Sequence, residues 1–185
     1  GSDNTFLGYK AGNAGGTGDN NVAVGKEALY STTTGYSNVC IGREAGHDIT
    51  TGHLNVYIGY QAGTVATTTE NNVFIGSISG QSVTSSNACT GCGRGSLSSL
   101  TTGDTNTALG YDAGSEVTTG ANNSFIGYRA GKSDSPSGSV TTGDNNVVLG
   151  NNSVQNLYCA DTSISSSDSR DKTDVTDFTK GLDWI

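Results

Sequence analysis

The chain has 185 residues, of which 32% are hydrophobic and 28 are glycine, and its formal net charge at pH 7 is -8. So few apolar residues exclude a wide globular core. The scattered acidic charge argues against a nucleic-acid-binding surface, which needs a basic face to replace counterions. No run of about 18 apolar residues is present, so no membrane insertion is expected.

A short motif recurs along the first 150 residues: an asparagine, three mostly apolar residues and a glycine. Its clearest copy runs from Asn38 to Gly42. The nine glycines that end these motifs are Gly8, Gly25, Gly42, Gly59, Gly76, Gly91, Gly110, Gly127 and Gly150. Most steps between them are 17 residues, but those around Gly91 are 15 and 19, and the last is 23. A nearly fixed short period is typical of solenoids, whose repeats bury their apolar faces against their neighbours.

We therefore predict an all-β fold: a parallel β-solenoid, or β-roll, of about nine 17-residue coils over residues 4–150. Each motif is expected to form a strand, because β-branched residues lie between an Asn and a Gly. If side chains alternate with a period of two, Val56 and Ile58 line the core and Tyr57 faces outward. The alanine that follows in six repeats, such as Ala62, is expected to point into the same narrow core.

The asparagines that begin the repeats are expected to lie one above another. Such a ladder lets each amide donate and accept hydrogen bonds along the stack. Its predicted members are Asn4, Asn21, Asn38, Asn55, Asn72, Asn87, Asn106, Asn123 and Asn146. The rest of each repeat is interpreted as a turn, commonly Thr-Thr-Gly, and the 23-residue step as an inserted loop at residues 132–139.

The chain contains four cysteines, Cys40, Cys89, Cys92 and Cys159. Cys40 and Cys89 are interpreted as small packing residues that share one repeat position. Cys89 and Cys92 spell a Cys-x-x-Cys, but a zinc site would need a second pair or nearby histidines. We therefore expect no metal and no cofactor.

A single thin roll buries little apolar area, so lateral association would add stability. The sequence predicts a homotrimer of intertwined or side-by-side chains that meet along an aromatic stripe. The candidate stripe consists of Phe6, Tyr57, Phe74, Phe125, Tyr9, Tyr60, Tyr111 and Tyr128. The alternative is that these are unrelated surface aromatics.

The repeats resemble two families. Their Asn-initiated strands and the alanine that follows are similar to the left-handed parallel β-roll heads of trimeric autotransporter adhesins. Their Gly-Tyr-x-Ala-Gly and Thr-Thr-Gly-x-Asn-Asn units are similar to the repeat regions of bacteriophage tail fibres.

The C-terminal segment favours the second family. Residues 167–172 resemble the Ser-Asp-x-Arg-x-Lys junction at which a self-cleaving intramolecular chaperone domain begins in phage endosialidases, tail spikes and tail fibres. The resemblance implies that Ser167 is the nucleophile, Lys172 its base and Ser167–Asp168 the bond that is cut. Arg170 would lower the lysine pKa or orient Asp168.

This resemblance implies three regions: the repeat array at 4–150, a connector at 151–167 and the N-terminal fragment of a chaperone domain at 168–185. We expect autoproteolysis only with the full chaperone domain, and no enzyme activity in the array. The implied function is structural and adhesive, in a phage tail fibre that binds a host-surface glycan or protein. The fibre would be part of the virion and extracellular after assembly.

Three alternatives have weaker support. A bacterial trimeric adhesin head would continue into a heptad-based stalk, and no heptads are present. A glycan-processing solenoid would need a pair of carboxylates, and no pair stands out. An ice-binding solenoid would need a flat threonine face, whereas the Thr-Thr pairs here are expected to point to opposite sides.

Overall fold

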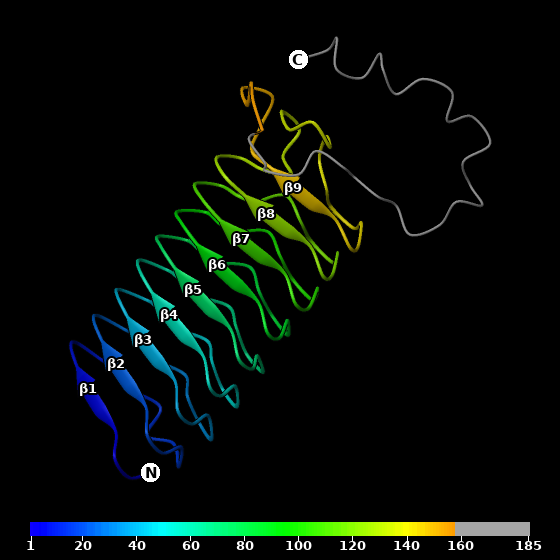
Figure 1. Cartoon of the computed structure of the whole chain (residues 1–185). Helices are drawn as coiled ribbons and strands as arrows, with labels where there is room; N and C mark the ends of the chain where they lie inside the picture. The colour runs from blue at the N-terminus through cyan, green and yellow to red at the C-terminus, as the bar shows by residue number, and fades with distance from the viewer. Residues whose placement is uncertain (158–185) are drawn as a thin grey trace, which may run out of the picture. The chain divides into compact units, whose positions relative to one another are not determined.

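The computed structural model describes residues 1–157. These residues form nine strands of three residues each and no helix. The strands are β1 (Thr5–Leu7), β2 (Val22–Val24), β3 (Val39–Ile41), β4 (Val56–Ile58), β5 (Val73–Ile75), β6 (Thr90–Cys92), β7 (Thr107–Leu109), β8 (Ser124–Ile126) and β9 (Val147–Leu149). They pair in sequence order into one sheet of parallel strands (Figure 1). The predicted all-β parallel solenoid is confirmed.

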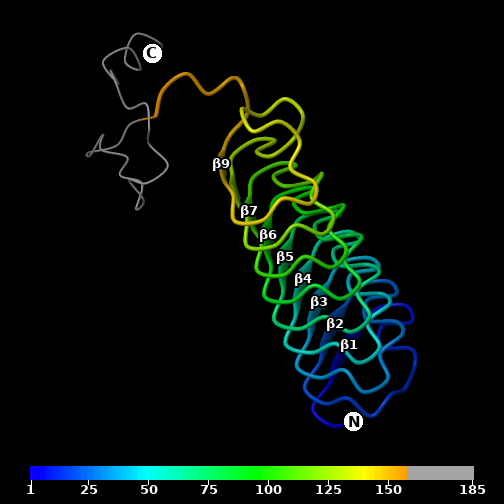
Figure 2. The same cartoon turned by 90° about the vertical axis from the view of Figure 1, so that its right-hand side faces the viewer.

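The chain divides into a compact unit, Gly1–Asn152, which contains all nine strands, and a second unit, Ser153–Ile185, which is described only as far as Leu157. Within the first unit, Ile41 pairs with Ile58 and Ile58 with Ile75, so equivalent residues lie one above another. In a view rotated by 90°, the successive coils lie one above another along the stack (Figure 2). The longer last step accommodates the loop predicted at residues 132–139, which lies between β8 and β9.

The repeat is more regular than the motif spelling suggests. Cys92 pairs with Ile75 on one side and with Leu109 on the other, so Gly93 ends this repeat. Gly91, which the sequence analysis placed at that position, is instead the middle residue of β6. The prediction was wrong because residues 87–91 imitate the motif two residues too early. The strands β1 to β8 are therefore all related by 17 residues.

The middle residue of each strand, and not the outer two, faces the core. Tyr57 and Phe74 are fully buried, whereas Ile41 and Ile75 are each 37% exposed. The prediction that Val56 and Ile58 line the core was therefore wrong. Six ladder asparagines are buried, and each lies two residues before the middle residue of a strand, so alternation with a period of two places both on the inner side.

The inward side chains compensate for one another in size. Gly63 faces the ring of Tyr57: a Cβ on this glycine would lie 2.6 Å from a ring carbon. Two coils reverse this arrangement, with Ala23 and Leu29 in one and Gly91 and Leu97 in the other. In the coil of β7 both positions are small, Ala108 and Gly114, and Phe125 and Leu97 of the two neighbouring coils lie beside Gly114, so the core stays filled along the stack.

Small residues follow each strand because neighbouring coils approach closely there. Gly59 has a φ of 134°, and a Cβ on it would lie 2.5 Å from the carbonyl oxygen of Gly76 in the next coil. The alanine three residues later points inward as predicted, since Ala28, Ala45, Ala62, Ala113 and Ala130 are all buried. The backbone spacing of the solenoid therefore excludes side chains at this corner.

Candidate functional surfaces

The residues predicted to carry chemistry lie outside the described part of the chain. Ser167, Asp168, Arg170 and Lys172 all follow residue 157, as does Cys159. The autocleavage site therefore stays a prediction, as does the division into connector and chaperone fragment. The candidate functional features within residues 1–157 are the surfaces of the solenoid.

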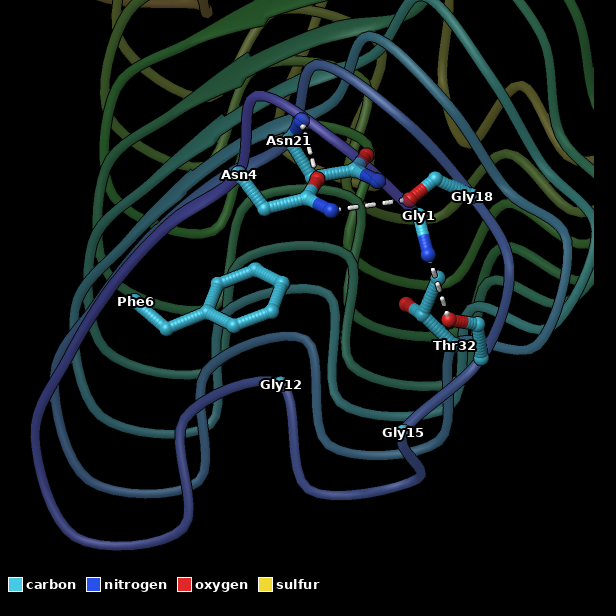
Figure 3. A pocket seen from close by; sticks show the side chains of 9 residues that line it. Gly1, Asn4, Phe6, Gly12, Gly15, Gly18, Asn21 and Thr32 are labelled. Atoms are coloured by element: carbon cyan, nitrogen blue, oxygen red, sulfur yellow. Dashed lines mark hydrogen bonds between the residues drawn. The ribbon is translucent and has the colours of Figure 1, made fainter.

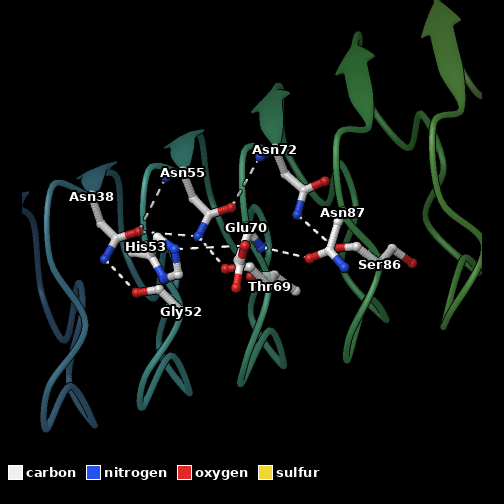
Figure 4. A network of polar contacts seen from close by, with 9 residues as sticks. All are labelled: Asn38, Gly52, His53, Asn55, Thr69, Glu70, Asn72, Ser86 and Asn87. Atoms are coloured by element: carbon white, nitrogen blue, oxygen red, sulfur yellow. Dashed lines mark hydrogen bonds and ion pairs between the residues drawn. The ribbon is translucent and has the colours of Figure 1, made fainter.

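The asparagine ladder ties each coil to the next (Figure 4). The side-chain amide of Asn55 donates to the carbonyl of Thr69 at 2.8 Å and to the Oδ1 of Asn38 at 3.1 Å. Its own Oδ1 accepts from the backbone N–H of Asn72 at 3.0 Å. Because these groups are buried, each contact satisfies a polar atom that has no access to water.

One member of the ladder is a cysteine. Cys89, and not the predicted Asn87, lies between Asn72 and Asn106 in the column. Its thiol donates to the carbonyl of Gly103 at 3.3 Å and accepts from the N–H of Asn106 at 3.4 Å. Burial raises the pKa of this thiol to about 11. Counting 17 residues from Asn72 would have identified Cys89.

Cys40 and Cys89 therefore do not share a repeat position, contrary to the prediction. Cys40 is the middle residue of β3 and belongs to the apolar core. Its side chain lies close to Gly46, where an added Cβ would be 2.5 Å from the sulfur. Both residues are buried, and burial raises the pKa of each thiol.

The predicted aromatic stripe is only partly on the surface. Tyr57, Phe74 and Phe125 are buried, and Phe6 is exposed in the first coil. The exposed column two residues after the strands contains Tyr9, Tyr60, Tyr111 and Tyr128. Basic side chains accompany these rings.

Two tyrosines of this column have an arginine from the preceding coil over the ring. The guanidinium of Arg43 lies 4.5 Å from the ring centroid of Tyr60 and donates to its hydroxyl at 2.7 Å. Arg94 donates in the same way to Tyr111 at 3.0 Å. The column therefore contains two pairs in which a guanidinium group lies against an aromatic ring in a cation–π contact.

The first and third residues of the strands form a second, larger surface, which we call the outer sheet face. It comprises two residues from each of nine strands, eighteen in all, and none is charged. Fourteen are Val, Leu, Ile or Cys, and the other four are Thr5, Thr90, Thr107 and Ser124. Cys92, a free and exposed cysteine, lies on this face.

The Thr-Thr pairs stabilise the turns. Before the last coil, the first threonine of a pair donates its hydroxyl to the carbonyl of the equivalent residue in the next coil, as Thr101 does to Thr118 at 2.9 Å. The second threonine, such as Thr102, is exposed. The hydroxyls of these first threonines are therefore used in hydrogen bonds between coils.

A cavity of about 210 Å³ lies at the first coil, where Phe6 is seen from the open end of the stack (Figure 3). Its polar side chains are Asn4, Asn21 and Thr32, and the rest of its lining is glycine and Phe6. Asn4 donates to the carbonyl of Gly18 at 2.9 Å and so continues the ladder. The cavity is thus the uncovered end of the core column, without an acid–base pair among its side chains.

Among residues 1–157, no group of three or more His, Cys, Asp or Glu side chains is placed to hold a metal ion. The same residues include no helix that is long and apolar enough to cross a membrane. Comparison of the chain with models of protein families, with curated proteins and with solved structures found no match.

Proposed function

We propose that this chain is a structural and adhesive segment of a virion fibre of the phage tail-fibre kind, and that it works as a homotrimer. The observation that supports a fibre role best is the unbroken stack of nine strands joined by the asparagine ladder. Parallel strands about 4.8 Å apart give a rod on the order of 40 Å long. Such a rod suits a stiff spacer.

The hydrogen-bond columns account for the stiffness. Strand pairing, the asparagine ladder and the threonine hydroxyls all connect one coil to the next, at different corners of the cross-section. Bending the rod would lengthen all the hydrogen bonds of whichever column lies on its convex side. A buried hydrogen bond that is broken without replacement costs about 1–3 kcal/mol, so the stack resists bending.

The exposed tyrosine and arginine column supports the adhesive part of the proposal. Aromatic faces with neighbouring guanidinium groups suit contact with the receptor proposed here, a host-surface glycan or protein. Arg43 and Tyr60 in one coil pair, and Arg94 and Tyr111 in another, repeat this arrangement along the rod. A bacterial trimeric adhesin head would share these features and is the second candidate.

The chaperone junction suggested by residues 167–172 has a physical purpose in such a fibre. Because the coils repeat, one chain could slide along another by one coil and regain similar contacts. A domain that aligns three chains before the repeats associate would remove this error. Cutting the domain off afterwards would make assembly irreversible, because the trimer could no longer unfold through its nucleus.

The test is to express the chain together with any sequence that follows Ile185 in its gene. We expect the wild type to release a C-terminal piece whose first residue is Asp168, as measured by denaturing gel and mass spectrometry. Ser167→Ala and Lys172→Ala should remain uncut, whereas Ser165→Ala should be cut like the wild type. Uncut wild type, or variants cut like the wild type, would refute the junction and with it the preference for a phage fibre.

A further inference from the structure

We infer that the outer sheet face is the surface through which copies of this chain associate, side by side, parallel and in register. The inference rests on the proposed fibre function and gives its trimer a contact surface. It differs from the aromatic stripe of the sequence analysis, most of whose ring residues on the strands are buried.

The composition of the face indicates a partner. The chain carries 26 charged side chains, 9 basic and 17 acidic, yet none falls on the eighteen positions of this face. Leu7, Leu109 and Val147 are 67%, 41% and 73% exposed. Monomeric proteins rarely expose continuous apolar patches of more than a few hundred Å².

The outer sheet face and the tyrosine column beside it are together about as large as one side of a stable protein–protein interface. Nine strands about 4.8 Å apart span about 43 Å, and the five residues from the first strand position to the tyrosine column span about 16 Å. The product, about 700 Å², is close to the roughly 800 Å² that each partner buries in a standard interface. Tyr60 and Arg43 would then lie at the rim, and both residue types are enriched at interfaces.

The regularity of the face indicates that the partner is another copy of the chain. Ile41, Ile58 and Ile75 repeat at the strand spacing, one above another. A partner that meets every strand equally needs the same spacing, and a second copy has it. Copies related by rotation about an axis parallel to the stack keep each coil level with its equivalent.

The polar residues of the face favour parallel over antiparallel packing. In a parallel, in-register contact, strands of the same number meet, so the hydroxyl residues of β1, β6, β7 and β8 lie level with their equivalents in the other copy. In the antiparallel contact that aligns the two ends, strand one meets strand nine and the four hydroxyl residues all meet valines: Thr5 with Val147, Thr90 with Val56, Thr107 with Val39, and Ser124 with Val22. Buried hydroxyls against valine would lack partners, at a cost of about 1–3 kcal/mol each.

Cys92 provides a test of the register. It is exposed on β6, whereas Cys40 and Cys89 are buried. Parallel, in-register copies place their Cys92 residues at the same level of the stack, within reach of a disulfide or a short bis-maleimide. Antiparallel copies place Cys92 opposite Ile58 and separate the two thiols by two coils, or about 10 Å along the stack.

The experiment uses the Cys159→Ser variant, so that Cys92 is its one exposed thiol among the cysteines of the chain. Mild oxidation should give a covalent dimer on a non-reducing gel, and adding Cys92→Ser should abolish it. As a matched control, Ser99→Cys in the Cys159→Ser, Cys92→Ser background places a thiol on an exposed turn after β6 and should give no dimer. Light scattering of the uncrosslinked protein should give the mass of a trimer.

A charge on the face is the second test. Ile75→Lys with Leu109→Lys should reduce the mass to that of a monomer and leave the circular dichroism spectrum unchanged. A trimer that crosslinks through Ser99→Cys but not through Cys92 would refute the inference and leave the fibre proposal standing. A monomeric wild type would refute both the contact surface and the proposed trimer, independently of the cleavage experiment.

Discussion

The coil at residues 55–71 and the coil at residues 89–105 share a backbone but differ inside. Gly63 and Leu97 occupy the same position with φ values of 58° and 51°. The ladder residue is Asn in one coil and Cys in the other, and the middle strand residue is Tyr57 in one and Gly91 in the other. The comparison shows that inward residues are interchangeable when the coil keeps its volume and its hydrogen bonds to the next coil.

The largest expected effect comes from disturbing the balance of size. Gly63→Leu should lower the free energy of unfolding by roughly 3–5 kcal/mol, because its side chain would collide with the ring of Tyr57 and take a positive φ. Guanidinium unfolding measures the loss.

Two controls separate the collision from backbone strain. Gly15 also has a positive φ, 62°, but no atom lies within 4 Å of a Cβ added there. Gly15→Leu should therefore lower the free energy of unfolding by less than Gly63→Leu does. Combining Gly63→Leu with Tyr57→Ala imitates the coil of Ala23 and Leu29. The double variant should be more stable than the sum of the two single losses predicts, and strict additivity would contradict size compensation.

Removing a ladder amide should have the next largest effect. Asn55→Ala leaves the buried N–H of Asn72 without its partner and removes one of the two hydrogen bonds to the carbonyl of Thr69, which also accepts from the N–H of His53. We expect a loss of about 2–4 kcal/mol in the free energy of unfolding, measured in the same way. Asn4→Ala, at the partly exposed end of the ladder, should lose much less, and equal losses would contradict a buried ladder.

Completing the ladder should stabilise the protein. Cys89→Asn replaces two weak sulfur contacts, to Gly103 and Asn106, with amide hydrogen bonds like those of the other coils. The expected gain is about 1–2 kcal/mol, detected as a higher unfolding midpoint. Cys40→Asn, which puts the same side chain into the apolar core, should instead destabilise. A Cys89→Asn variant less stable than the wild type would argue that Cys89 is required for packing.

The smallest effect is a pH dependence. The pKa of Cys89 is raised by burial from 9.0 to about 11, so the folded state favours the neutral thiol. Its contribution to stability is complete below pH 9 and is lost as the pH rises through 11. Between pH 9 and pH 10 the wild type should lose roughly 1 kcal/mol more than Cys89→Asn. Parallel stability curves for the two proteins would show that this thiol is not buried in solution.

Much of the architecture was predictable from the sequence because the repeat is a one-dimensional signal. Eight of the nine strands, their parallel stacking, the inserted loop and the inward alanines all followed from spacing and residue type. The members of the asparagine ladder were also predicted correctly, except at Cys89, because residues 87–91 match the repeat motif and Asn87 was chosen in its place. A simpler rule, a constant step of 17 residues, would have placed this coil correctly.

By itself, the sequence determined the period and, in eight of the nine coils, the strand position and the glycine corner that follows it. Only the tertiary structure decided which side of each strand is inside, because alternation defines two faces without saying which one is buried. The asparagine column settles that choice: its amides turn inward to bind carbonyls 14 residues further along the chain, such as those of Gly52 and Thr69, and the middle strand residue follows them. The valines and isoleucines are thereby left on the outer sheet face, where we place the contact with another copy.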